Sequence, residues 1–462
     1  MTKASTALHH ILTTYSITPT QLTTALQIPT ATFTAWLQGH LTPPADRLAA
    51  LISTLHHLNP QAAEDVIQLY LEEANPPIFS PTPLPPSDSL NIPALARLFN
   101  DTTNSYKYLF FLSLLDILRR HHFQPTSPIA FFDLIVEMLA NAWFPHSYFK
   151  LSFGSQDKIA QQLDALALVV EAPVVQFKDP DKTLLRQAIA RQDLKDTITH
   201  LRRYVPFRLI IPFLAADLGA VSRGRGNQLD VAMPAIADRH FDSRRPLYRF
   251  DSTEYKTCQG IIPHPDWLHY LQQHDPIIRR WAAWEWLTYM QKRNPNTPAI
   301  ASKLFMPSKR DSLKTQTNYW SQVLTHQTIP CIYSGQPIPP QGFSLDHYLP
   351  WSFVAHDQLW NLIPTLPEVN SAKSNKIPAP SHLAHFHRLQ HQGLTITHAT
   401  LPPAQWSKQV EPYLHHLGLA NPHDLLNLER LRNAYDKTLP PLITLAANQG
   451  FLTDWRYGSQ AG

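Results

Sequence analysis

Five side chains between residues 346 and 373 have types and spacing suited to acid–base and metal chemistry. The adjacent pair Asp346 and His347 is followed by Asn361 and Asn370, at offsets of 14 and then 9 residues, and by Lys373 one helical turn later. A neutral histidine can remove a proton from water near neutral pH, so His347 is the predicted general base. Because Mg²⁺ prefers oxygen ligands, Asp346 and Asn370 are the predicted metal ligands.

Two strands and a helix are needed to bring these residues together. FSLDHYLP predicts a first strand, WSFVAHDQL a loop, WNLIPT a second strand, and PEVNSAKSN a short helix that begins at Pro367. Asp346 and His347 would lie on the first strand, Asn361 on the second and Asn370 on the helix. Adjacent strand residues point to opposite faces, so the use of both Asp346 and His347 requires a local bend, which the sequence does not show.

The segment resembles the HNH endonuclease family, also called ββα-metal or His-Me finger nucleases. Its histidine-to-asparagine offsets are similar to those of the HNH domain in RNA-guided CRISPR nucleases. The resemblance covers about 45 residues and rests on CIYSG at 331, Asp346-His347, Pro350, Asn361-Leu362, Asn370, Lys373 and Pro378.

This resemblance implies metal-dependent hydrolysis of phosphodiester bonds, with Asp346, His347, Asn361 and Asn370 as the catalytic set. Asn361 would tie the hairpin together and help to fix the histidine. One Mg²⁺ or Mn²⁺ ion per active site would stabilise charge on the phosphate and on the departing 3′-oxygen. Lys373 faces the same way as Asn370 on a helix and could contact a substrate phosphate, although a solvated surface role is the alternative.

Two departures from the family pattern and two competing interpretations remain. The only cysteines are Cys258 and Cys331, and Ser334 stands where a partner thiol could lie, so no structural zinc is expected. The last catalytic position, often histidine in the family, is Asn370. The polar residues could instead satisfy backbone hydrogen bonds in a loop-rich hairpin, or the segment could be a degenerate, inactive nuclease domain.

The sequence of residues 1–74 predicts a small helical domain. In SITPTQLTTALQIPTATFTAWLQG, Thr18 is a predicted N-cap, with Pro19 at the first helical position and Gln21 three residues after the cap. A second short helix follows and ends at Gly39. Two helices joined by a tight connection are therefore expected.

With flanking helices at about 5–15 and 45–58, this region resembles the helix-turn-helix of phage-repressor-type regulators, although the turn Gln27-Ile28-Pro29 lacks the usual glycine. Residues 1–92 carry 2 basic and 6 acidic side chains, so this region has few positive charges with which to neutralise DNA phosphates. Packing or protein contact is therefore the alternative to DNA binding. The residues that would read bases are Thr30, Ala31, Thr32, Thr34 and Gln38.

Residues 75–93 are proline-rich and predict a semi-rigid linker, and residues 94–326 predict a basic, mostly helical region with one strand at APVVQF. The three tryptophans of WAAWEW, at positions 281, 284 and 286, favour a core role over base stacking. The basic residues of this region could form a phosphate-binding face, or they could simply be solvated. They are Arg202, Arg203, Arg223, Arg225, Arg244, Arg245, Lys292 and Arg293.

The predicted fold is mostly α and multidomain: a helix-turn-helix-like bundle, a helical middle region, a small ββα-metal HNH module at 327–380 and a helical region at 381–462. No apolar run is long enough to cross a membrane and no signal peptide is evident, so a cytoplasmic protein is expected.

The predicted activity is a metal-dependent DNA endonuclease, and the combination favours bacterial antiviral defence or a mobile element by analogy. The alternative is a non-catalytic DNA-binding regulator or adaptor. Double-stranded DNA is the expected partner, a protein or guide-RNA complex could bind through the N-terminal domain, and a homodimer would supply the two active sites that a double-strand break needs.

Overall fold

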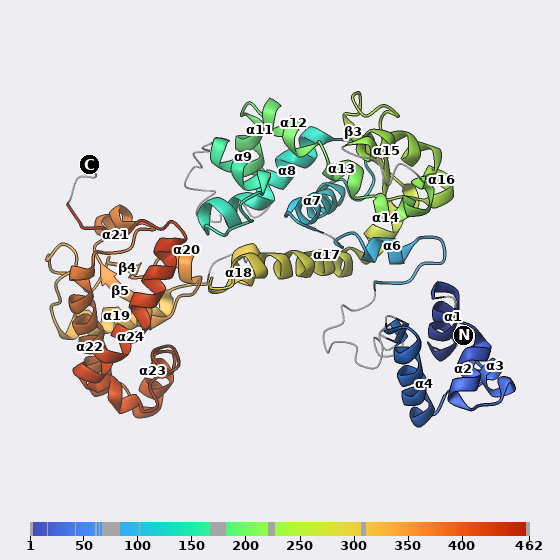
Figure 1. Cartoon of the computed structure of the whole chain (residues 1–462). Helices are drawn as coiled ribbons and strands as arrows, with labels where there is room; N and C mark the ends of the chain where they lie inside the picture. The colour runs from blue at the N-terminus through green and yellow to red at the C-terminus, as the bar shows by residue number, and fades with distance from the viewer. Residues whose placement is uncertain are drawn as a thin grey trace. The chain divides into compact units, whose positions relative to one another are not determined.

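The computed structural model describes residues 3–15, 17–41, 43–60, 62–63, 65–66, 84–100, 102–166, 182–219, 227–305 and 311–458. Helices make up most of it, and turns, loops and a few short antiparallel strands make up the rest, which confirms the mostly α fold class (Figure 1). The chain separates into two compact units, Met1–Leu84 and Pro85–Gly462. Within the described ranges, no helix has the length and hydropathy needed to cross a membrane.

Among the described residues of the first unit are helices at the four positions that its sequence predicts. Thr18 and Gln21 form the expected capping box: the Thr18 hydroxyl accepts from the Gln21 amide at 3.3 Å, and Gln21 Oε1 accepts from the Thr18 amide at 2.8 Å. Gln27 takes the left-handed conformation, with φ 51°, at the turn where a glycine is usual. The helices are α1 (Lys3–Thr14), α2 (Pro19–Leu26), α3 (Thr30–Leu37) and α4 (Ala45–Leu58).

The second unit begins with a helical region that packs around α7, whose apolar sequence YLFFLSLLDIL is buried rather than membrane-spanning. The three-stranded antiparallel sheet has the order β1-β3-β2. The predicted strand APVVQF and residues 75–83 of the linker predicted at 75–93 lie outside the described residues. The elements up to the sheet are α6 (Ile92–Ala96), α7 (Tyr106–Arg120), β1 (Ile129–Ala130), α8 (Phe131–Trp143), the π-helical η1 (Phe144–Tyr148), α9 (Lys158–Leu166), α11 (Thr183–Ala190), α12 (Lys195–Leu201), α13 (Val205–Arg208), α14 (Ile211–Leu214), η2 (Ala215–Asp217), α15 (Gln228–Arg239), α16 (Phe241–Arg244), β2 (Tyr248–Phe250) and β3 (Gly260–Pro263).

A single long helix, α17 (Pro265–Arg293), packs along α7 and leads toward the C-terminal part of the unit (Figure 1). The tryptophans of the WAAWEW segment differ in burial: Trp281 and Trp286 are buried, as a core role predicts, whereas Trp284 is 53% exposed. The short helix α18 (Ile300–Leu304) follows.

The C-terminal part is built around a two-stranded hairpin. Strands β4 (Ser344–His347) and β5 (Leu362–Thr365) pair antiparallel and are followed by α21 (Pro367–Lys373), which is the predicted strand–strand–helix order. The segment between the strands, which the sequence predicts as a loop, also contains α20 (Trp351–Val354) and the 3₁₀ turn η4 (Leu359–Asn361).

Helices surround this hairpin and share one hydrophobic core with it (Figure 1). Trp360 beside the hairpin, Phe386 on α22 and Tyr435 on α24 are all buried in that core, so the C-terminal helices pack directly against the module. The surrounding elements are α19 (Lys314–His326), η5 (Pro380–His382), α22 (Leu383–Thr400), α23 (Pro403–Leu417), η6 (Pro422–Leu426) and α24 (Leu428–Asn448).

Candidate active site

The hairpin that carries the candidate residues is regular. Asp346 is paired with Ile363 and His347 with Leu362, and the described register from 344 to 365 contains no bulge. The side chains of Asp346 and His347 therefore leave opposite faces of the hairpin. The bend that a shared use of these side chains would require is absent from the strand, which instead ends at His347.

Asp346 faces inward and lies in a buried polar cluster. Its Oδ1 accepts a hydrogen bond from Lys373 Nζ at 2.8 Å, and its Oδ2 accepts one from the Tyr333 hydroxyl at 2.7 Å. Asp346 is only 2% exposed. Burial raises the pKa of Tyr333 well above its ordinary value, and the neighbouring Asp346 carboxylate adds to the rise, so Tyr333 remains a donor.

Lys373 does not lie at the surface, where the sequence predicts that it could contact a phosphate. It is fully buried, and its ammonium group donates both to Asp346 and to the backbone carbonyl of His347, the latter at 2.6 Å. A buried ammonium requires a countercharge and hydrogen-bond acceptors, and Asp346 and the His347 carbonyl supply them. These hydrogen bonds link α21 to β4, so Lys373 has a structural role here and does not face solvent as a phosphate ligand would.

His347 faces the loop between the strands and meets Asp357. The distance from His347 Nε2 to Asp357 Oδ1 is 2.8 Å, and the side chains are 12% and 16% exposed. A carboxylate at one ring nitrogen holds the proton there, which leaves Nδ1 as the basic nitrogen. Asp357 was not among the residues singled out from the sequence, and the signal that could have identified it is an acid inside the loop that closes the hairpin.

Asn361 ties the loop to the hairpin through two hydrogen bonds to one residue. Its side-chain oxygen accepts from the Leu349 amide at 2.8 Å, and its side-chain nitrogen donates to the Leu349 carbonyl at 2.9 Å. Asn361 is fully buried and stands at the end of the 3₁₀ turn, immediately before β5 rather than on it. Its geometry is that of a structural tie.

Asn370 lies half-buried on α21, one turn before Lys373, and α21 packs against β4. One carboxylate and one amide oxygen are hard donors of the kind that Mg²⁺ accepts with several waters. Each Asp346 oxygen has a second lone pair beyond its hydrogen bond, so the donor set fits such an ion in type. Among the described residues, no cluster of three or more His, Cys, Asp or Glu side chains could hold a metal.

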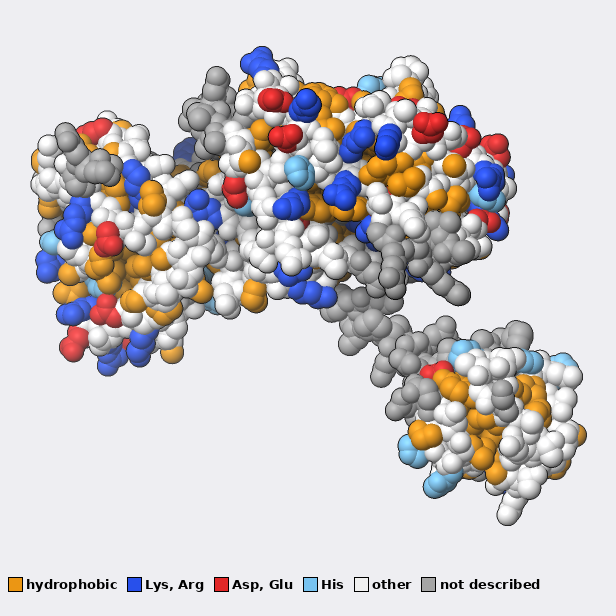
Figure 2. Space-filling model, turned by 45° about the horizontal axis from the view of Figure 1, so that its top comes forward, with side chains coloured by type: hydrophobic (Ala, Val, Ile, Leu, Met, Phe, Trp, Pro, Cys, Tyr) orange, Lys and Arg blue, Asp and Glu red, His pale blue; other side chains and the backbone are white. Residues whose placement is uncertain are grey.

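The predicted nucleic-acid-binding residues of the middle region have separate internal partners. Arg244 forms two hydrogen bonds with Asp217, at 2.8 and 3.0 Å, and Arg245 contacts Asp266 at 3.1 Å. Figure 2 shows Lys and Arg side chains interspersed with Asp and Glu on the visible face of this unit. A shared phosphate-binding face therefore stays a prediction.

The other members of that set have varied surroundings. Arg202 donates to the Cys258 carbonyl at 3.1 Å, and Arg293 donates to the Thr103 carbonyl at 3.0 Å. Arg203 lies over the Tyr204 ring and Lys292 is exposed, whereas Arg223 and Arg225 lie outside the described residues. In the first unit, the predicted base-reading residues Thr30, Thr32, Thr34 and Gln38 are exposed or half-exposed, and they lie on or directly beside α3.

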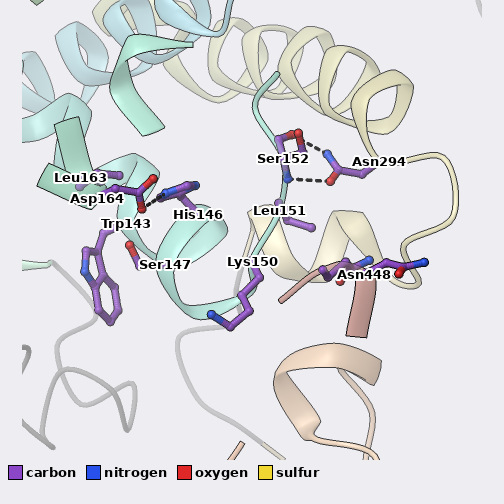
Figure 3. A pocket seen from close by; sticks show the side chains of 11 residues that line it. Trp143, His146, Ser147, Lys150, Leu151, Ser152, Leu163, Asp164, Asn294 and Asn448 are labelled. Carbon is purple, nitrogen blue, oxygen red and sulfur yellow. Dashed lines mark hydrogen bonds and ion pairs between the residues drawn. The ribbon is translucent and has the colours of Figure 1, made fainter. Parts of the chain in front are cut away.

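A second histidine–aspartate pair lies far from this hairpin in the sequence. His146, in the π-helical turn η1, has its Nε2 2.8 Å from Asp164 Oδ1. Both residues line a cavity of about 640 Å³, together with Lys150, Asn294 and Gln449 (Figure 3). Asp164 is 72% exposed, so this pair borders solvent.

Comparison with known proteins places the hairpin in a family. Residues 331–379 match the family described as HNH endonuclease. These residues form an HNH endonuclease domain. The match covers 49 of the 462 residues and falls inside the predicted module at 327–380. No curated protein and no solved structure matches the chain significantly. Because the match is confined to the HNH domain, the helix-turn-helix resemblance of the first unit stays a prediction.

Proposed function

We propose that this chain is a metal-dependent endonuclease that hydrolyses phosphodiester bonds of DNA in its HNH domain. The observation that carries the proposal is the contact between His347, the last residue of β4, and the Asp357 carboxylate, in a hairpin tied by Asn361. A general base needs an oriented ring where substrate can reach it, and the end of a strand offers such a position.

His347 Nδ1 takes a proton from a water molecule as the water oxygen bonds to phosphorus. The bond between phosphorus and the 3′-oxygen breaks, and the leaving oxygen takes a proton from solvent. Asp357 holds the ring through Nε2 and stabilises the imidazolium that forms. The group that Asp346 and Asn370 would hold is one Mg²⁺ or Mn²⁺ ion, which supplies charge stabilisation at the phosphate.

Lys373 supports this site from within. Its ammonium group joins the Asp346 carboxylate to the backbone of His347, so it fixes the end of β4 against α21. Asp346 and His347 are neighbours, with Cα atoms about 3.8 Å apart, and both stand at the end of β4. We assign Lys373 to positioning rather than to substrate contact.

The remainder of the chain serves substrate selection in this proposal. The first unit binds DNA, or a protein or guide-RNA complex, through the exposed face of α3, and the middle region holds the duplex. Each active site cuts one strand, so a double-strand break takes a homodimer or two binding events. A role in bacterial defence or in a mobile element is consistent with this combination by analogy alone.

The test is cleavage of supercoiled plasmid with Mg²⁺, with Mn²⁺ and with a chelator, by the full chain and by His347→Ala. We expect nicking that requires the divalent ion and is lost in the variant. Cleavage that survives the substitution would remove His347 as the base. Plasmid binding without cleavage by the unsubstituted chain would favour the alternative, a non-catalytic DNA-binding regulator or adaptor.

A further inference from the structure

A cavity of about 730 Å³ adjoins the candidate active site. Its wall includes His356, Asp357 and Gln358 from the loop between the strands, and Asp357 is the residue whose carboxylate meets His347. The volume lies within the range of pockets that bind small organic groups, about 300–1,000 Å³. Whatever occupies this cavity therefore contacts the segment that orients the predicted general base.

Glutamines are prominent among the polar residues that line the cavity. The Oε1 atoms of Gln316, Gln358 and Gln409 are buried, and each has no hydrogen-bond partner among the described residues. Gln316 Nε2 donates to the Asp357 carbonyl at 2.9 Å, which leaves the Gln316 oxygen as an acceptor. Buried acceptors without partners are costly, so a small turn of these amides toward a ligand with N–H donors would be favourable.

The other lining groups favour a planar, weakly charged occupant. Trp351 contributes an aromatic side chain. Burial lowers the pKa of His356 to about 4, with His416 and His347 adding to the shift, so His356 is neutral at physiological pH. Asp311, Asp357 and Lys408 are the charged residues of the lining, and their formal sum of −1 disfavours a phosphate inside the cavity.

We propose that this cavity receives one unstacked nucleobase of the strand being cut, next to the scissile phosphate. The inference rests on the proposed nuclease function and specifies its substrate: a single strand, or a duplex with one base turned out of the stack. Glutamine amides pair with the donor and acceptor edges of bases, and aromatic side chains stack on base faces. A stacked base cannot enter a pocket, so local unpairing is required. The acceptor-rich wall selects bases with an exocyclic amine over thymine.

The experiment uses the full chain and a labelled single-stranded oligonucleotide in which an abasic nucleotide is moved past the cut, position by position. We expect kcat/KM to fall about ten-fold or more at one position beside the cut and little elsewhere. Gln409→Leu should lower kcat/KM on the intact strand, but it should have no further effect on the strand that is abasic at that position. The matched control is Gln322→Leu, because Gln322 is half-buried on α19, lies outside the cavity lining, and donates to Thr400.

Two outcomes overturn the base pocket while leaving the nuclease intact: an abasic scan without position dependence, or Gln409→Leu and abasic effects that simply multiply. Absence of cleavage on every substrate would instead overturn the nuclease proposal. A cleavage-independent readout then still decides the pocket: 2-aminopurine placed at successive positions, titrated with the chain in metal-free buffer. A change in fluorescence confined to one position and lost in Gln409→Leu supports the pocket, and a uniform response contradicts it.

Discussion

Among the described residues, two histidine–aspartate pairs have the same length but very different settings. His347 and Asp357 are joined at 2.8 Å, as are His146 and Asp164. Both pairs border a cavity, of about 730 and 640 Å³ respectively. The difference is in the acid: Asp357 is 16% exposed, whereas Asp164 is 72% exposed. The dielectric constant around Asp164 is therefore closer to that of water, and its hold on the imidazole is weaker.

The supporting structure differs as well. His347 ends a strand whose register, buried ion pair and Asn361 tie are all defined, whereas His146 belongs to a single π-helical turn. Catalytic groups need rigid neighbouring residues to hold them within a fraction of an ångström. A histidine–carboxylate contact alone therefore does not identify an active site, and the surrounding framework decides.

The largest expected effect separates the two histidines. His347→Ala should lower the rate of metal-dependent cleavage by about 10²–10⁴-fold, because the general base is removed. His146→Ala, the matched substitution, should leave that rate within about two-fold. The measurement is the initial rate of plasmid nicking for both variants, after circular dichroism has shown that each is folded. Equal losses in the two variants would contradict the distinction.

The next effect concerns the buried framework that only the His347 pair possesses. Lys373→Met removes the countercharge of a carboxylate that is 2% exposed, so the second unit should lose about 3–5 kcal/mol of stability. Urea unfolding measures this loss. The double variant Lys373→Met with Asp346→Asn should recover much of the stability, because no unpaired buried charge remains. If Lys373 instead contacts phosphate on the surface, stability should be unchanged and DNA affinity should fall.

These contacts also mark how far the sequence could predict the site. The hairpin and helix were predictable as two short strand-like segments followed by a helix that begins at Pro367. The HNH resemblance predicted Asp346, His347, Asn361 and Asn370. Lys373 was predicted at the surface because lysine is rarely buried without a partner, and sequence spacing alone cannot show that Asp346 is that partner.

Two further partners were beyond prediction for a related reason. Asp357 lies in an irregular loop, 10 residues from His347, where no periodicity relates sequence distance to spatial distance. Tyr333 reaches Asp346 from a turn before the hairpin. Contacts made by loops depend on the tertiary path of the chain, which local patterns do not specify.

A smaller effect tests the orienting carboxylate. Asp357→Asn keeps the size of the side chain but replaces an acceptor-only carboxylate with an amide, so His347 can adopt the other tautomer. Cleavage should fall about 10- to 100-fold with little change in KM, because ring orientation acts on the chemical step. Kinetics on a single labelled oligonucleotide separate kcat from KM. A change in KM alone would indicate that Asp357 contacts the substrate instead.

The smallest effect is expected at the exposed pair. Asp164→Asn breaks a contact whose acid is 72% exposed, and such pairs contribute about 0–1 kcal/mol because water and salt screen them. Thermal unfolding should therefore change by a few degrees at most, and cleavage should be unaltered. A loss of cleavage comparable to that of Asp357→Asn would mean that the cavity at His146 takes part in the reaction. The framework around His347 would then not be what distinguishes the two pairs.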